Sequence, residues 1–100
     1  MQYLITAHDG PDMLEKRMEV RPRHLENMER VKKTGSVVCA GGILDGEGRP
    51  VGSALVLDFA SKDLLDEYLE HEPYIVEKVW ETVTVEPMHV VILRDETVGN

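Results

Sequence analysis

The order in which two kinds of hydrophobic pattern follow one another places the tightest constraint on this fold. Segments rich in alternating and β-branched apolar residues predict strands, and segments with apolar residues at helical spacing predict helices. The predicted strands cover 2–7, 36–40, 51–59 and 80–85, with Pro87 interrupting the last and a further short strand or extension at 90–93; the predicted helices cover 12–19, 22–34 and a segment that begins after Ser61. This β-α-β-β-α-β order is typical of an α+β, ferredoxin-like split βαβ fold, in which an antiparallel sheet carries both helices on one face.

Prolines and glycines predict where the helices end. Pro22 cannot continue a helix smoothly but suits a first turn, so we expect it to separate a short helix from a main one. Gly35 is expected to stop the main helix. Glu72 precedes a proline and is therefore biased toward extended backbone, so the last helix should end near His71.

The length of 100 residues fits one domain, residues 1–100, rather than two. A chain this short buries only a modest fraction of its surface on folding. With both helices on one face of the sheet, the apolar side chains of the other face need a cover. A second copy of the chain is the most economical cover, so we expect a homodimer.

The charge balance argues against two classes of partner. The formal net charge is -8, whereas nucleic acid and anionic membrane surfaces call for clustered basic residues. No segment reaches the roughly 18 consecutive apolar residues that a membrane span needs. Residues 1–8 lack the basic start and the long apolar run of a signal peptide. We therefore expect a cytoplasmic protein that acts on a small molecule, with neither nucleic acid nor membrane as a partner.

Neither a metal nor a cofactor is predicted. The single cysteine, Cys39, lies in a predicted buried strand, where we expect a small core residue. The spacing of the histidines matches no metal-binding signature. Gly41-Gly42 and the glycines that follow lack the lysine and the strand–loop–helix setting of a phosphate-binding loop. We therefore expect chemistry that uses side chains alone.

Two residues from separate segments, His24 and Glu72, could form an acid–base unit. His24 shares the apolar stripe of the main helix with Met28 and Val31, so its ring is expected to face the interior or the mouth of a cleft. Taken alone, His24 could be a hydrogen-bonded core residue and Glu72 an exposed acid. In a split βαβ fold, however, the end of the second helix can lie near the start of the first, which would join the two as a general acid–base pair.

Four further residues are candidates for contact with a substrate. Ser53 is the only polar residue in the inward row of the third strand and could hydrogen-bond a substrate or the histidine. Tyr74 could form a wall of the pocket. Arg17 and Arg21 could hold a substrate anion, because arginine presents a planar fork that suits carboxylates. The alternative for each is a structural role, as a small strand residue, a packing residue or part of a solvated helix surface.

Several of these residues fall in short motifs that, in this order, resemble one protein family. The motifs are Glu15-Lys16-Arg17, Arg21-Pro22-Arg23-His24-Leu25, Gly41-Gly42, Gly52-Ser53 and Glu72-Pro73-Tyr74. Over residues 2–87 the chain resembles the YciI-like proteins. The resemblance implies a ferredoxin-like α+β fold that forms a dimeric α+β barrel, with an active site around a His–Asp pair. The family histidine corresponds to His24 and the family aspartate to Glu72, which keeps the charge but adds a methylene.

The resemblance also indicates a class of reaction. Most members have no known function, but one is a dehydrochlorinase that acts on a chlorinated hydroxyhydroquinone, and the fold is similar to that of muconolactone isomerases. We therefore expect a small cofactor-free enzyme, a lyase or isomerase, in which His24 and Glu72 catalyse elimination, such as dehydrochlorination, or isomerisation of a small cyclic or aromatic-derived metabolite. The alternative is a non-catalytic dimer that binds a small ligand or a partner.

Overall fold

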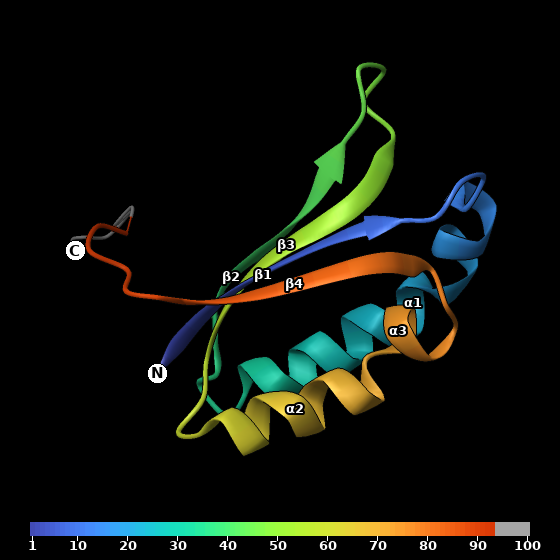
Figure 1. The fold of residues 1–100 in the computed structure, drawn as a ribbon. Helices are drawn as coiled ribbons and strands as arrows, with labels where there is room; N and C mark the ends of the chain where they lie inside the picture. Colours follow the sequence, from blue (N-terminus) through green and yellow to red (C-terminus); the bar gives the residue numbers. More distant parts are fainter. Residues whose placement is uncertain (94–100) are drawn as a thin grey trace.

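A four-stranded antiparallel sheet forms the frame of the protein, in a computed structural model that describes residues 1–93. The strand order is β2-β3-β1-β4, and the helices lie together on one face of the sheet (Figure 1). The elements are β1 (Gln2–Asp9), α1 (Leu14–Lys32), β2 (Val37–Leu44), β3 (Pro50–Asp58), α2 (Lys62–His71), α3 (Pro73–Val76) and β4 (Trp80–Met88). The predicted β-α-β-β-α-β order and the ferredoxin-like α+β class are confirmed, with the short helix α3 added before the last strand.

The register of the two central strands decides which residues face the helices. β1 pairs with β3 from Gln2 opposite Asp58 to His8 opposite Gly52. Because side chains alternate across a strand, the odd-numbered residues of both strands point to the same face. The core lies between this face and the helices, and its buried residues are Tyr3, Ile5, Ala7, Val20, Met28, Val31, Leu55, Leu57, Leu65, Tyr68, Tyr74, Val79 and Trp80.

Helix α1 runs without a break through Pro22, so the predicted division into two helices is wrong. Proline lacks the N–H that would bond the carbonyl four residues earlier, which costs about 3 kcal/mol in a helix interior. Val20 before the proline and His24 after it are both buried against the core, and this packing offsets the loss. One continuous helix places Arg17, Arg21 and His24 at positions i, i+4 and i+7, on a single face.

The predicted helix ends near Gly35 and His71 and the predicted cap at Ser61 are confirmed, whereas the helix expected to begin at residue 12 begins at Leu14. The chain leaves α1 through a turn in which Gly35 has a left-handed φ of 78°, a conformation that glycine adopts without a steric penalty. Ser61 caps α2, its side chain accepting the Leu64 backbone N–H at 3.3 Å. α2 ends at His71, and Glu72 has the extended backbone that a following proline favours.

The edge strand β2 differs from the prediction in two ways. It continues through Gly41-Gly42 to Leu44 instead of ending at residue 40. Cys39, which was predicted to be buried, is exposed. The reason is that β2 pairs only with β3, and Cys39 lies opposite Val56, on the face of the sheet that the helices do not cover.

At the opposite edge, β4 also differs from the prediction. It runs through Pro87 to Met88, because an edge strand can accommodate a residue without an N–H. No strand forms at 90–93, so the predicted extension is wrong. Gln2, the first residue of β1, already lies opposite Met88, and β1 therefore offers no further residue for pairing.

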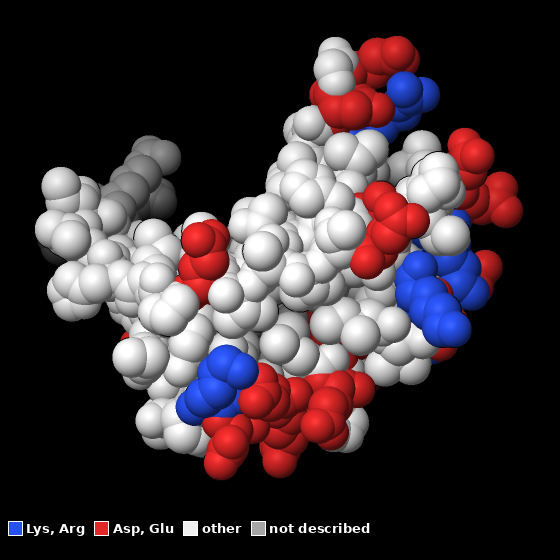
Figure 2. Space-filling view, viewed as in Figure 1, with Lys and Arg blue, Asp and Glu red and all other residues white. Residues whose placement is uncertain are grey.

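Charged side chains gather over α2 and at the turn between β2 and β3, whereas the surface over the strands is mostly uncharged in Figure 2. Asp45 holds that turn by accepting the backbone N–H groups of Glu47 and Arg49 at 2.8 and 3.0 Å. These hydrogen bonds lower the pKa of the Asp45 carboxyl. Among residues 1–93, no helix has the length and apolar character to cross a membrane.

Candidate active site

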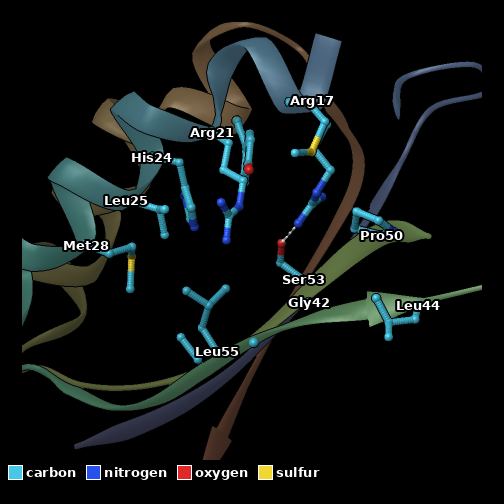
Figure 3. Close-up of a pocket in the computed structure, with 14 residues that line it drawn as sticks. Arg17, Arg21, His24, Leu25, Met28, Gly42, Leu44, Pro50, Ser53 and Leu55 are labelled. Atoms are coloured by element: carbon cyan, nitrogen blue, oxygen red, sulfur yellow. Dashed lines mark hydrogen bonds between the residues drawn. The ribbon is translucent and has the colours of Figure 1, made fainter. Parts of the chain in front are cut away.

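A cavity of about 740 Å³ lies between α1 and the strands β2 and β3 (Figure 3). Arg17, Arg21 and His24 line it from α1, and Ser53 and Tyr74 line it from β3 and α3. In Figure 3 the α1 side chains extend from the helix toward the sheet, and the ends of Arg21 and His24 point into the same space. The fold thus brings together on one cavity all the predicted site residues except the glutamate, which contacts His24 from within the core.

The contact between His24 and Glu72 is the centre of this site. His24 Nδ1 lies 2.8 Å from Glu72 Oε2, and the glutamate is completely buried. Oε2 also accepts the Tyr74 backbone N–H at 2.9 Å, and Oε1 accepts the Tyr68 hydroxyl at 2.5 Å. Donors on both oxygens offset the cost of removing the carboxylate from water. The alternative of an exposed Glu72 is therefore wrong.

Glu72 reaches His24 because it stands between two helices. It is the C-cap of α2 and the N-cap of α3, with Pro73 at the first position of α3. An N-cap side chain turns back to accept an N–H of the first helical turn, here that of Tyr74. The same turn directs the carboxylate at α1. The glutamate side chain, which is one methylene longer than that of aspartate, therefore contacts the imidazole directly.

The surroundings of the carboxylate indicate which ring nitrogen of His24 carries a proton. Burial and the charge of Glu72 raise the pKa of the Tyr68 hydroxyl far above its ordinary range, so this group remains a donor. An ionised carboxylate can only accept, so we assign the proton of the neutral imidazole to Nδ1. Nε2 is then a proton acceptor on a ring that lines the cavity, which is the state that a general base requires.

Aromatic rings hold the imidazole in this orientation. The Tyr74 ring stacks on His24 with centroids 4.2 Å apart and an interplanar angle of 21°, and Trp80 meets His24 edge-on at 6.2 Å. Arg17 Cζ lies 4.6 Å from the centroid of the Tyr74 ring, within range of a cation–π interaction. Burial raises the pKa of the Tyr74 hydroxyl, and the charges of Arg17 and Arg21 oppose that rise. Tyr74 therefore forms a wall of the cavity that also packs against the candidate base.

A second set of buried hydrogen bonds holds Arg17 and Ser53 in place. Arg17 Nη1 donates to both carboxylate oxygens of Asp9, at 2.8 and 3.0 Å. Its Nη2 donates to the Gly52 carbonyl at 3.0 Å and to Ser53 Oγ at 2.8 Å. Trp80 Nε1 donates to the same hydroxyl oxygen at 3.3 Å. Arg17 is therefore buried in a hydrogen-bonded network, and the alternative of a solvated helix surface is wrong for it.

Arg21 differs from Arg17 in having no carboxylate of its own. Its side chain is exposed at the cavity, and no acidic group within residues 1–93 forms an ion pair with it. Its side chain lines the same cavity as His24 and extends toward the sheet in Figure 3. An unpaired guanidinium in this place is suited to an oxygen anion of a ligand.

Sequence reasoning missed three residues of the site, Asp9, Tyr68 and Trp80. A signal existed for two of them. Asp9 continues the odd-numbered inward row of β1, and Tyr68 precedes Glu72 by one helical turn, a spacing at which side chains meet. Trp80 begins β4 after a turn, and no local pattern relates it to Ser53. Within the part of the chain that the structure describes, no group of three or more His, Cys, Asp or Glu side chains is placed to hold a metal ion.

Two known proteins have sequences similar to that of this chain. The aspercryptin biosynthesis cluster protein B of Emericella nidulans is 36% identical over 87 residues, which make up 80% of this chain and 56% of that protein. The chain thus spans little more than half the length of that relative. Protein YciI of Escherichia coli O6:H1 is 33% identical over 93 residues, which make up 87% of this chain and 95% of that protein.

Solved structures share the fold. The 5-chloro-2-hydroxyhydroquinone dehydrochlorinase TftG from Burkholderia phenoliruptrix AC1100, in complex with 2,5-dihydroxybenzoquinone, matches with a TM-score of 0.82 at 23% identity, over 89% of this chain and 94% of that one. An antibiotic biosynthesis monooxygenase matches with a TM-score of 0.56 at 15% identity, over 91% of this chain and 98% of that one. The YCII-related domain matches residues 1–89, so this chain belongs to the YCII-related domain family.

Proposed function

We propose that this protein is a small enzyme that catalyses elimination, such as dehydrochlorination, or isomerisation of a small cyclic or aromatic-derived compound. The observation that carries the proposal is the 2.8 Å contact of His24 with the buried Glu72, beside a cavity of about 740 Å³. TftG, a dehydrochlorinase of the same fold, supports the choice of reaction class. The proposed chemistry uses side chains and no cofactor.

In the proposed step, His24 Nε2 takes a proton from the substrate. In a dehydrochlorination, the electron pair of the broken bond to hydrogen forms a new π bond while chloride leaves with the electrons of the carbon–chlorine bond, so no oxidant or reductant is needed. In an isomerisation, the proton returns to a different atom. Glu72 holds the ring and stabilises the imidazolium that forms. Acid–base help of this kind supplies about 10²–10⁴-fold, and positioning of the substrate supplies the remainder.

The substrate-binding residues of the proposal are those that line the cavity around His24. Arg21 would contact an oxygen anion directly, because it has no internal partner within residues 1–93. Tyr74 would form a wall of the substrate pocket. Arg17 and Ser53 would act together, since Arg17 donates to the serine hydroxyl. The formal net charge of -8 would repel an anionic substrate. The positive charge of Arg21 offsets this repulsion at the cavity.

We also propose that two copies of the chain pack together through the open sheet face, which is the face of the sheet that the helices do not cover. Leu4, Ile43 and Ala54 are only half-buried on that face, and the cysteine of β2 is exposed beside Val56. A second copy would bury this apolar surface, as expected for a homodimer. A single unpaired thiol fits a reducing compartment, and we propose a cytoplasmic location without nucleic-acid or membrane partners.

Chloride release from a chlorinated hydroxyhydroquinone tests the proposed reaction. Wild-type protein should release chloride, and His24→Ala should lose most of the activity, on the order of 10²–10⁴-fold. The matched control is His71→Ala, which removes an exposed histidine at the end of α2 and should leave the rate unchanged. Equal rates for His24→Ala and wild type would overturn the mechanism. Binding of the quinone 2,5-dihydroxybenzoquinone without turnover of chlorinated or isomerisable substrates would instead support a ligand-binding protein.

A further inference from the structure

The hydroxyl of Ser53 is surrounded in a way that leaves it one hydrogen-bonding role. Its oxygen accepts from Arg17 Nη2 at 2.8 Å and from Trp80 Nε1 at 3.3 Å. A serine hydroxyl has two acceptor sites and one donor proton. Guanidinium and indole N–H groups can only donate, so neither contact can be reversed. Both acceptor sites of Ser53 are therefore occupied, and only its proton is available.

The available proton belongs to a residue of the cavity wall. Ser53 lines the cavity together with His24 and Arg21, and the residue is almost fully buried, with 3% of its surface exposed. No acceptor within residues 1–93 takes its proton. A hydrogen-bond acceptor of a ligand in the cavity would complete the bonding of this hydroxyl.

The groups that orient Ser53 are themselves buried and paired. The side chains of Arg17 and Asp9 are 6% and 4% exposed and form an ion pair at 2.8 Å. Arg17 also holds the Gly52 carbonyl, next to Ser53 in the chain. Gly52 has no room for a side chain, because a Cβ there would collide with the Ala7 carbonyl oxygen. The backbone and the hydroxyl oxygen of Ser53 are thus both fixed before any ligand binds, which is the preorganisation that an oxyanion-binding group needs.

We infer that Ser53 is a dedicated hydrogen-bond donor for an acceptor oxygen of the ligand, a phenolate, enolate or carbonyl oxygen, and that Asp9, Arg17 and Trp80 position it for this task. The inference deepens the proposed function by naming the substrate class, and it rests on the same cavity. The positive charge of Arg17 on the hydroxyl oxygen strengthens the donor, so an ionised oxygen is preferred over a neutral one. An oxygen held between Ser53 and Arg21 would lie beside the imidazole of His24, where the developing charge of a deprotonated substrate needs stabilisation.

The test uses 4-nitrocatechol, a phenol whose absorption spectrum distinguishes the neutral from the ionised form. Titrated with wild-type protein, the bound probe should become ionised at lower pH than the free probe. Ser53→Ala should bind it roughly 10–100-fold more weakly and lose most of this spectral shift. Trp80→Phe keeps the hydroxyl but frees one acceptor site, so the loss should be smaller than for Ser53→Ala. Ser36→Ala, which removes a buried serine outside this cavity, is the matched control and should behave as wild type.

Two outcomes would overturn the inference. The first is a folded Ser53→Ala protein with wild-type affinity and spectral shift, and the second is a wild-type protein that binds the dimethyl ether of the probe as tightly as the probe. The ether measurement needs no variant, so it can overturn the inference even if Ser53→Ala does not fold. The same comparison in a His24→Ala background separates this inference from the proposed reaction. There the Ser53-dependent shift should persist even though turnover is lost.

Discussion

Replacing Glu72 by glutamine removes a charge from the site while keeping its shape. The amide oxygen can still accept from His24 and from the Tyr74 N–H, and the Tyr68 hydroxyl can turn to accept from the amide nitrogen. We therefore expect little disturbance of folding. What is lost is a negative charge 2.8 Å from the imidazole, and this charge matters most after the ring has taken a proton.

The size of the effect follows from the difference between charged and neutral hydrogen bonds. A hydrogen bond to a charged group contributes about 1.5–3 kcal/mol, and one between neutral groups about 0.5–1.5 kcal/mol. A difference of roughly 1–2 kcal/mol in the barrier lowers a rate constant about 5–30-fold. Complete burial of Glu72 strengthens its electrostatic interactions and places the expected loss of kcat at the upper end of that range. KM should change little, because Glu72 does not line the cavity.

Steady-state chloride release from the chlorinated hydroxyhydroquinone gives kcat and KM for wild type and Glu72→Gln. Glu70→Gln, the same chemical change at an exposed position of α2, is the matched control. Thermal unfolding followed by circular dichroism checks that all three proteins are folded. A kcat for Glu72→Gln within about twofold of wild type would show that the carboxylate does not stabilise the transition state.

Four further predictions concern the same network and the open sheet face. Asp9→Asn leaves the buried Arg17 charge without its partner and should lower the free energy of unfolding by about 3–5 kcal/mol in urea denaturation; a loss below about 1 kcal/mol would contradict a buried ion pair. Glu72→Asp shortens the side chain by one carbon–carbon bond, about 1.5 Å, and should reduce kcat at least as much as Glu72→Gln; full activity would show that the backbone follows the shorter acid. Stability should fall as pH rises above the ordinary tyrosine pKa of 10.0, because the pKa of Tyr68 is raised in the folded protein and the unfolded chain loses this proton first. In urea denaturation above this pH, Tyr68 should lower the free energy of unfolding by about 1.4 kcal/mol per pH unit. A Tyr68→Phe protein with the same slope as wild type would contradict the raised pKa of Tyr68. Cys39 should react rapidly with a thiol reagent in dilute solution and more slowly at concentrations where two copies associate; a rate independent of concentration would contradict the proposed homodimer.

Much of the site could be predicted because its residues follow simple periodicities. The stripe of Met28 and Val31 on α1 placed His24 inward, and Glu72 before a proline marked the end of α2. The two segments meet because the strand and helix order allows few arrangements. The contact of His24 with Glu72 could be expected from that order, whereas its distance and its burial depend on the cap geometry that links α2 to α3.

The remainder could not be predicted because it depends on tertiary contacts. A proline normally ends a helix, and only packing on both sides of Pro22 keeps α1 continuous. Arginine near a helix start is usually solvated, and the burial of Arg17 depends on its ion pair with Asp9 of β1. Cysteine is usually a buried residue. Cys39 is exposed because it lies on β2, at the edge of the sheet. In each case a partner distant in the sequence decides the outcome.

The position of the proton on the neutral His24 ring decides whether this residue can act as a general base. Two-bond and three-bond ¹H–¹⁵N correlation spectra of protein labelled with ¹⁵N-histidine distinguish the two tautomers of a neutral imidazole. The 2.8 Å contact with the buried Glu72 carboxylate predicts a proton on Nδ1 and none on Nε2, at a pH where the ring is neutral. A neutral ring with its proton on Nε2 would contradict the account, because Nε2 could then not accept a proton from a substrate in the cavity.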